Sequence, residues 1–254
     1  MIDEVFPFPT VKQVIFQIHF PNLFYLESKI GEFQIRIMDE FPESALSLRQ
    51  QLVITEYNQA PEQGEIKKPV SNESSGTKIW HFKTDKNYEL NITTNSLDIT
   101  SGAHKTYNNK KSDIRFRDII EYAVGNFISV MAIPIITRIG LRYIDECPMP
   151  ELNNEAHKSL YNTAFPLDRF DLSDATEMDF KALVSRNGYS LRYIESLQWQ
   201  DNKPFLVLDF DSFAKKITTD TYLDVTDRLH EVISEEYEAT ITERLKNYMR
   251  TNKL

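Results

Sequence analysis

Residues 11–20 read VKQVIFQIHF, and their pattern points to the architecture of the whole chain. Large apolar groups recur at every second position, namely Val14, Phe16, Ile18 and Phe20. Gln17 and His19 fall between them and point to the other side of an extended chain. This alternation predicts a half-buried β-strand, which Pro21 ends.

Outward from this strand, the first half of the chain predicts a helix and a group of strands. Apolar residues at helical spacing before Pro42 predict a helix over Glu27–Phe41. Strands are predicted at Gln51–Tyr57, Thr77–Thr84 and Tyr88–Thr94, with a short fourth at Ser96–Thr100. The polar residues Asn58–Gly76 lack large apolar anchors and predict a mobile loop. Ser112 is a suitable N-cap for a second helix that continues to Met131.

The second half predicts the same order of elements. A strand at Ile135–Ile144 precedes a short helix at Asn154–Phe165, and a long final helix is predicted over Tyr222–Tyr248, with Thr221 and Asp224 as a capping-box-like pair. Three strands lie between the helices, at Met178–Arg186, Tyr189–Trp199 and Phe205–Phe210. Asn187-Gly188 predicts a tight type I′ hairpin, and Trp199–Pro204 a longer one.

The resulting fold class is α+β, with two similar β-α-β-β-β-α halves at 1–134 and 135–254. The two halves are either duplicates or two unrelated α+β units, and one continuous domain is the alternative division of the chain. If they are duplicates, we expect their antiparallel sheets to join edge to edge. The product would be a helix-grip or saddle-like pseudo-dimer with long helices over one side. Its uncovered sheet face would then be a binding surface.

Composition disfavours several classes of protein. The chain has 29 Lys and Arg against 38 Asp and Glu, and its net charge of −9 argues against nucleic acid and anionic membranes as partners. A single cysteine excludes a disulfide scaffold. The longest apolar stretch, near residues 127–136, is interrupted by Ser129 and Pro134 and falls short of the roughly 20 residues of a membrane span. Without a signal-like N-terminus, a cytoplasmic protein is expected.

Three stretches carry a resemblance to a known group of proteins. They are Pro9–Ile18, Arg138–Asp145, and the final helix with Leu229-His230 and Thr240-Ile241-Thr242. Over its full length the chain resembles a sporadically distributed family of uncharacterised bacterial proteins of about this size. The resemblance implies a single module with accessory-gene distribution, as seen among defence and toxin–antitoxin genes, and supplies no catalytic residue.

A short sequence motif that occurs twice is the most distinctive local feature. Residues 140–146 read GLRYIDE and residues 190–196 read SLRYIES. Alternation places Arg138 and Arg142 on one strand face flanking Gly140. Arg142 and Arg192 could present paired guanidinium groups to a carboxylate or phosphate on an exposed sheet face. The predicted binding residues are Arg138, Arg142, Arg192 and Tyr193. The alternative is that the arginines pair across strands with acids such as Glu195 and Asp209.

Two further clusters of charged residues are candidate sites. Asp209 and Asp211 share a face at a predicted strand end, and with Asp179 they could hold a divalent cation, although a solvated strand end is the plainer interpretation. The basic cluster Lys105, Lys110, Lys111, Arg115 and Arg117 could touch an acidic partner or be a solvated loop. No cofactor is expected, because the chain contains no Walker loop, Rossmann fingerprint or nucleophile elbow.

These observations favour a non-enzymatic protein-interaction module, with toxin neutralisation or phage defence as its context. The first alternative is a helix-grip protein that binds a small ligand between the long helix and the sheet, where many of the 16 Phe and 12 Tyr residues would lie. The second is a metal-dependent hydrolase on Asp179, Asp209 and Asp211. The sequence leaves the oligomeric state open.

Overall fold

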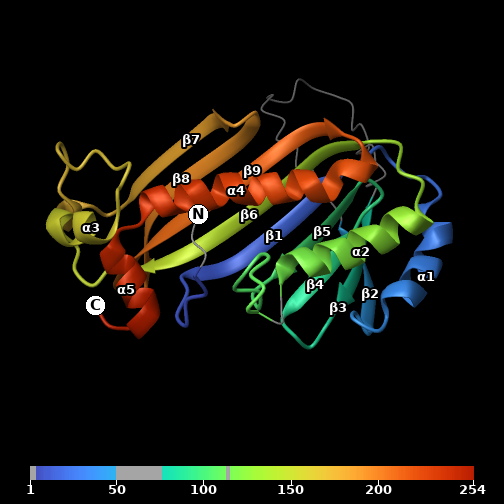
Figure 1. The fold of residues 1–254 in the computed structure, drawn as a ribbon, viewed down its shortest axis with the longest axis horizontal. Helices are drawn as coiled ribbons and strands as arrows, with labels where there is room; N and C mark the ends of the chain where they lie inside the picture. Colours follow the sequence, from blue (N-terminus) through green and yellow to red (C-terminus); the bar gives the residue numbers. More distant parts are fainter. Residues whose placement is uncertain (1–3, 50–75, 113–114) are drawn as a thin grey trace, which may run out of the picture.

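A computed structural model describes residues 4–49, 76–112 and 115–254. Its described residues form one nine-stranded sheet and five α-helices (Figure 1). The strands are β1 Val11–His19, β2 Glu43–Arg49, β3 Thr77–Lys83, β4 Tyr88–Ile92, β5 Ser96–Ser101, β6 Ile136–Pro148, β7 Met178–Arg186, β8 Tyr189–Gln200 and β9 Lys203–Ile217. The helices are α1 Leu26–Ile37, α2 Phe116–Val130, α3 Asn154–Leu160, α4 Tyr222–Thr240 and α5 Glu243–Thr251. The α+β class is therefore confirmed.

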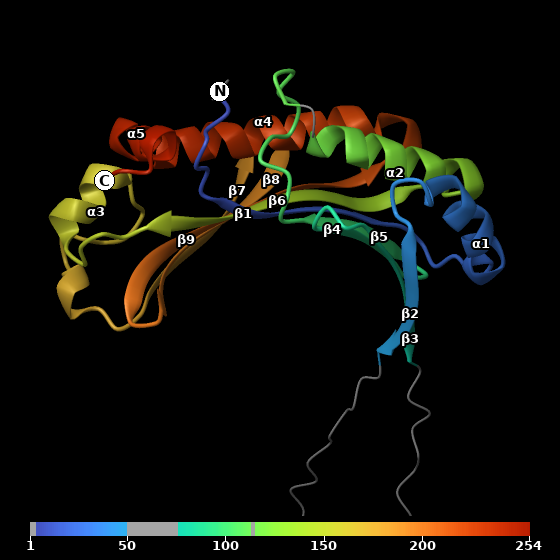
Figure 2. The same ribbon diagram turned by 90° about the horizontal axis from the view of Figure 1, so that it is seen from below.

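The sheet is antiparallel throughout, in the order β2-β3-β4-β5-β1-β6-β9-β8-β7. It arches strongly, and the long helices α2 and α4 lie along one face (Figure 2). The opposite face is concave and carries none of the described helices (Figure 2). None of the described helices is long and apolar enough to cross a bilayer.

The predicted alternation of β1 holds in the structure. Val14, Phe16 and Ile18 are buried toward the helices, whereas Gln17 and His19 occupy the concave face. The aromatic ring of Phe127 on α2 packs against Phe20 and against Phe33 of α1, with ring centroids 5.4 Å apart in both pairs. Each side chain of this size stabilises the fold by about 1.5–3 kcal/mol when it is fully buried.

One strand of the structure was not predicted. It is β2, Glu43–Arg49, and all seven of its residues are exposed. Because no residue of this strand is buried in the described structure, burial imposes no alternation of apolar groups on it, and its short stretch with Leu46 and Leu48 was not predicted as a strand. The strand predicted at Gln51–Tyr57 and the loop over residues 58–75 lie outside the described residues.

The final helix is interrupted, so the prediction of one helix over Tyr222–Tyr248 is wrong. Ile241 is extended, with φ −98° and ψ 147°, and forms a β-bridge with Tyr161. The backbone N–H of Thr242 donates to the Leu160 carbonyl at 3.0 Å, and its hydroxyl donates to the Ser159 carbonyl at 2.7 Å. Partners on another element therefore replace the helical bonds. The expected capping box is absent too, because the Thr221 hydroxyl bonds back to the Thr218 carbonyl.

Both hairpins of the second half are tight. Asn187 and Gly188 have φ of 51° and 84°, which confirms the predicted turn. The prediction of a longer loop at Trp199–Pro204 is wrong, because Gln200 pairs with Lys203 around a two-residue turn. Asp201 and Asn202 form that turn with φ of 51° and 61°, values that Asp and Asn tolerate better than most residues.

Candidate functional site

The two copies of the repeated motif, residues 140–146 and 190–196, lie on β6 and β8, the strands that flank β9. They share one register across it, so that Arg142 and Arg192 both pair with Asp211, and Tyr143 and Tyr193 both pair with Phe210. In the next row on the same face as the tyrosines, Asp145 and Glu195 flank Leu208. The repeat therefore builds similar rows on both sides of a single central strand.

The three predicted arginines do share the concave face, and each is paired with an acid. Arg142 donates to both carboxylate oxygens of Asp209, at 2.7 and 2.5 Å. Arg138 donates to both oxygens of Asp211 at 3.0 and 3.2 Å, and Arg192 reaches the same carboxylate at 3.4 Å. The pairing alternative is therefore the observed arrangement, although Glu195, named as a partner, lies on the opposite face.

Tyr193 does not join the arginines. It lies on the helix-covered face, 6% exposed, and its hydroxyl donates to Glu195 at 3.1 Å. Glu195 also accepts hydrogen bonds from the Thr163 hydroxyl and the Ala164 backbone N–H. His157 lies 3.4 Å from the same carboxylate. This buried group ties the segment after α3 to the sheet.

Gly140 does not leave an open approach for a partner chain. The Arg138 guanidinium lies over it, and a Cβ built on Gly140 would come within 2.6 Å of Arg138 Nη1. The guanidinium carbon also stands 4.7 Å from the centre of the Phe213 ring. The space above Gly140 is therefore filled by the arginine of the same strand.

The three aspartates proposed for a metal site are not brought together as ligands. Asp209 and Asp211 lie in the middle of β9 instead of at a strand end, and arginines hold both carboxylates. Asp179 pairs with Ser196, one row beyond them. Among the described residues, no group of three or more His, Cys, Asp or Glu side chains is placed to hold a metal ion.

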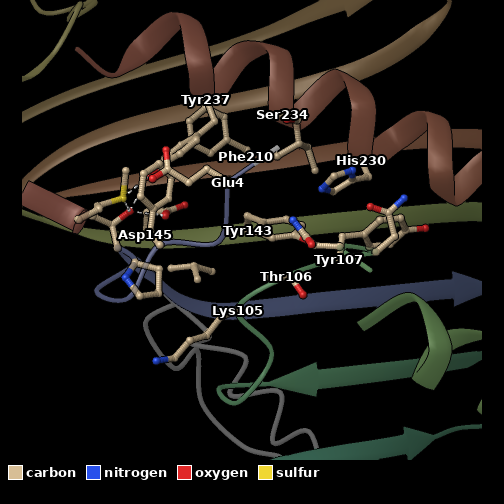
Figure 3. Close-up of a pocket in the computed structure, with 18 of the residues that line it drawn as sticks. Glu4, Lys105, Thr106, Tyr107, Tyr143, Asp145, Phe210, His230, Ser234 and Tyr237 are labelled. Atoms are coloured by element: carbon tan, nitrogen blue, oxygen red, sulfur yellow. Dashed lines mark hydrogen bonds between the residues drawn. The ribbon is translucent and has the colours of Figure 1, made fainter. Parts of the chain in front are cut away.

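A cavity of about 530 Å³ lies on the other face, between α4 and the sheet (Figure 3). Its lining mixes polar and apolar groups, and its aromatic side chains are those of Phe6, Tyr107, Tyr143, Phe210 and Tyr237, with the His230 ring. The N-terminal segment and residues 105–111 contribute further walls. The first of these is fixed to α5, because Arg250 donates to both carboxylate oxygens of Glu4 at 2.8 and 2.7 Å.

Asp145 is the buried acid of this cavity, only 4% exposed. Thr10 donates a hydrogen bond to its Oδ1 at 2.8 Å, and the Thr10 oxygen lies 2.7 Å from the Tyr237 hydroxyl (Figure 3). Burial raises the pKa of the Asp145 carboxyl to about 7, and the bond from Thr10 offsets only part of that effect. The carboxyl therefore changes its charge near neutral pH.

Two other polar groups of the lining, the hydroxyls of Tyr143 and Thr106, are buried and find no hydrogen-bond partner in the part of the chain that the structure describes. Such groups are rare in folded proteins, and each costs about 1–3 kcal/mol when it is left unpaired. The His230 ring stacks on Tyr107 with centroids 4.3 Å apart, and burial lowers the pKa of this imidazole to about 4. His230 is therefore neutral at physiological pH.

Asp227 of α4 fixes the segment that contains Tyr107. It accepts a hydrogen bond from the Tyr107 hydroxyl at 2.7 Å and two from Arg117 Nε and Nη2, at 2.9 and 3.1 Å. The predicted basic cluster is therefore divided. Its arginines make ion pairs, with Arg115 bound to Asp118, whereas Lys105, Lys110 and Lys111 are exposed at the edge of the cavity.

The cavity lies where the alternative prediction put a ligand, between the long helix and the sheet, but the sequence did not single out Asp145. Asp145 belongs to the first copy of the repeated motif. Its burial depends on Thr10 and Tyr237, which lie 135 and 92 residues away in the sequence. The strand was predicted to end at Ile144, one residue before Asp145, so the sequence placed this acid at a strand end and not in a buried row. No protein-family model matches the chain, and no curated protein matches it either.

Proposed function

We propose that this protein binds a small organic ligand in the cavity between α4 and the sheet, without catalysing a reaction on it. The observation that carries the proposal is Asp145, a buried carboxyl in a cavity of about 530 Å³ whose walls include several aromatic rings. Ligand sites are typically concave and mostly apolar, of about 300–1,000 Å³, with a few polar groups that fix orientation. A strongly raised pKa in such a place supports a functional role.

Native mass spectrometry of the purified protein tests this proposal. We expect a retained ligand mass, or an adduct after exposure to a small-molecule library, that is lost in Ser234→Trp because an indole ring at this lining position fills the cavity. Glu235→Trp is the matched control, since its position is the next on α4 and is exposed. The absence of any mass that distinguishes these two variants would contradict the proposal.

A protein partner, in toxin neutralisation or phage defence, stays a prediction from the sequence. Its expected surface was the concave face with Arg138, Arg142 and Arg192, whose guanidinium groups are engaged by Asp209 and Asp211. These internal pairs leave less unbalanced charge for a partner. Ligand binding on the opposite face is therefore the function that we favour.

We also propose that the two halves are copies of one β-α-β-β-β-α unit that form a helix-grip, saddle-like pseudo-dimer, with one additional strand in the first half, whose order is β1-α1-β2-β3-β4-β5-α2. The order of strands supports this, because β1 and β6 are antiparallel neighbours at the centre. Outward from them run β5-β4-β3-β2 on one side and β9-β8-β7 on the other, each in reverse chain order. Failure of β6, β9 and α4 to superpose together on β1, β5 and α2 would contradict the duplication.

A further inference from the structure

We infer that the cavity recognises an organic cation, an ammonium group carried on an aromatic or apolar body, and that Asp145 is the residue that selects it. This inference rests on the proposed ligand-binding function and names the chemical class of the ligand. It follows from the partners of Asp145, from the walls around it and from the distribution of charge.

Asp145 differs from the other buried acids of the sheet in its partners. Asp209 and Asp211 are held by arginines, and Glu195 accepts hydrogen bonds from Thr163, Ala164 and Tyr193. Asp145 occupies the same row as Glu195, yet the hydrogen bond shown for its carboxyl is the one from Thr10. Among the described residues it forms no ion pair. A buried carboxylate without a cation is costly, and a bound ammonium group would supply one.

The walls next to Asp145 suit a cation as well. Phe210 and Tyr237 meet edge to face, with centroids 5.9 Å apart, and Tyr143 lies on the same side of β6 as Asp145. Ring faces attract ammonium groups, by about 0.5–2 kcal/mol for each well-placed ring. The same rings would bury an apolar ligand body. Acid and aromatic groups therefore favour the same ligand.

The cavity has both a buried acid and exposed lysines in its lining, and the two would favour ligands of opposite charge. The exposed Lys105, Lys110 and Lys111 at its edge would attract an anionic ligand. Water and salt screen exposed charges, whereas a buried carboxylate acts in a medium of lower dielectric constant. We therefore expect Asp145 to outweigh the lysines, in keeping with the net charge of −9 of the whole chain.

Isothermal titration calorimetry with three matched probes distinguishes these possibilities. Tryptamine, tryptophol and indole-3-propionate share an indole ring and a two-carbon chain, and end in an ammonium, a hydroxyl and a carboxylate group. The titrations are run at about pH 8, above the pKa of about 7 of Asp145, so that its carboxyl is ionised. We expect tryptamine to bind at least about tenfold more tightly than either of the other two.

Asp145→Asn keeps the shape of the side chain and removes its charge. We expect it to weaken tryptamine at least about tenfold and to leave tryptophol within about twofold. Asp98→Asn is the matched control, because Asp98 is a partly buried acid of β5 on the concave face, bonded to Asn91. It should leave both affinities unchanged.

Tightest binding of indole-3-propionate, or an ammonium preference that survives Asp145→Asn, would overturn the inference. If tryptophol binds the wild type but not Ser234→Trp, and tryptamine has no advantage, the ligand-binding function stands and the cation inference fails. If none of the probes binds and no retained mass is found, both fail.

Discussion

Asp145 and Glu195 occupy the same row of the sheet but have very different hydrogen-bond partners. Both are almost fully buried on the helix-covered face, at 4% and 0% exposure. Glu195 is surrounded by hydrogen-bond donors from the segment after α3, whereas Asp145 faces a cavity and receives one from Thr10. The type of residue and its place in the sheet are nearly the same, so the neighbours decide which carboxyl is structural.

Asp145→Asn is expected to change how stability depends on pH. The folded-state pKa of about 7 lies above the ordinary aspartate value of 3.8, so between these two pH values the folded protein keeps a proton on this carboxyl that the unfolded chain has lost. The stabilisation from this group is present below about pH 4 and is lost as pH rises toward about 7, by up to about 1.4 kcal/mol per pH unit. Asparagine carries no such proton. The variant should match the wild type near pH 4 and exceed it by roughly 2–4 kcal/mol near pH 8.

Urea unfolding of both proteins over this pH range measures the difference. Burial lowers the pKa values of His104 and His230 to about 4. These histidines are present in both proteins, so their effect on the free energy of unfolding largely cancels in the difference between the two. Asp224→Asn, at an exposed position of α4, is the control. A difference that stays constant from about pH 4 to 8 would mean that the Asp145 carboxyl is already ionised in the folded state at acid pH.

Strand β6 carries two kinds of chemistry on its two faces. Arg138 and Arg142 lie on the concave side, and Tyr143 and Asp145 on the side of the cavity. Alternation was enough to predict which residues share a face, because the side-chain period of a strand is two. It was not enough to predict the partners of the arginines, which depend on β9 lying between β6 and β8.

Arg142→Ala tests whether the arginines of β6 are structural. It leaves the Asp209 carboxylate, 9% exposed, without its bidentate partner, so we expect a loss of about 1–2 kcal/mol in the free energy of unfolding. Asp209→Ala in the same chain should recover part of this loss, a coupling of about 1 kcal/mol in a double-mutant cycle. Arg228→Ala, which breaks an exposed pair with Glu231, should cost less than about 0.5 kcal/mol. Unchanged stability in Arg142→Ala would instead favour a partner-binding role.

Elements with strong periodicity were predicted well, and weakly patterned ones were not. β7 was predicted at its observed bounds, Met178–Arg186, because apolar residues alternate and Asn187-Gly188 closes it. β2 has no buried residue to produce a pattern. The break between α4 and α5 escaped prediction because Ile241 and Thr242 find their partners near α3, far away in the sequence.

At the scale of the molecule, the central pair β1 and β6 joins the two halves. This ladder runs from Val11 opposite Asp145 to His19 opposite Arg138, and the core described for the chain is a single cluster that includes Phe16, Leu90 and Leu208. A boundary at 134/135 would therefore fall in the connection from α2 to β6 and would not separate two sheets.

This continuity predicts that the protein unfolds in one cooperative transition. Circular dichroism and tryptophan fluorescence should give the same midpoint in urea, since Trp80 lies in β3 and Trp199 in β8, on opposite sides of the central pair. Phe16→Ala should lower that midpoint as a whole, at a cost of about 3–5 kcal/mol. Two separate midpoints would show that the halves are independent folding units.

The contact between Glu4 and Arg250 has a consequence for the path of the backbone. With Phe8 N–H donating to the Met249 carbonyl at 3.0 Å, it brings positions separated by 246 residues into contact. A short peptide linker from the stretch after Arg250 to the stretch before Glu4 would therefore close this part of the chain into a ring without moving the sheet. Cyclisation would restrict the unfolded chain, and new termini opened at the exposed Asn187-Gly188 turn would give a circular permutant with the same strand order.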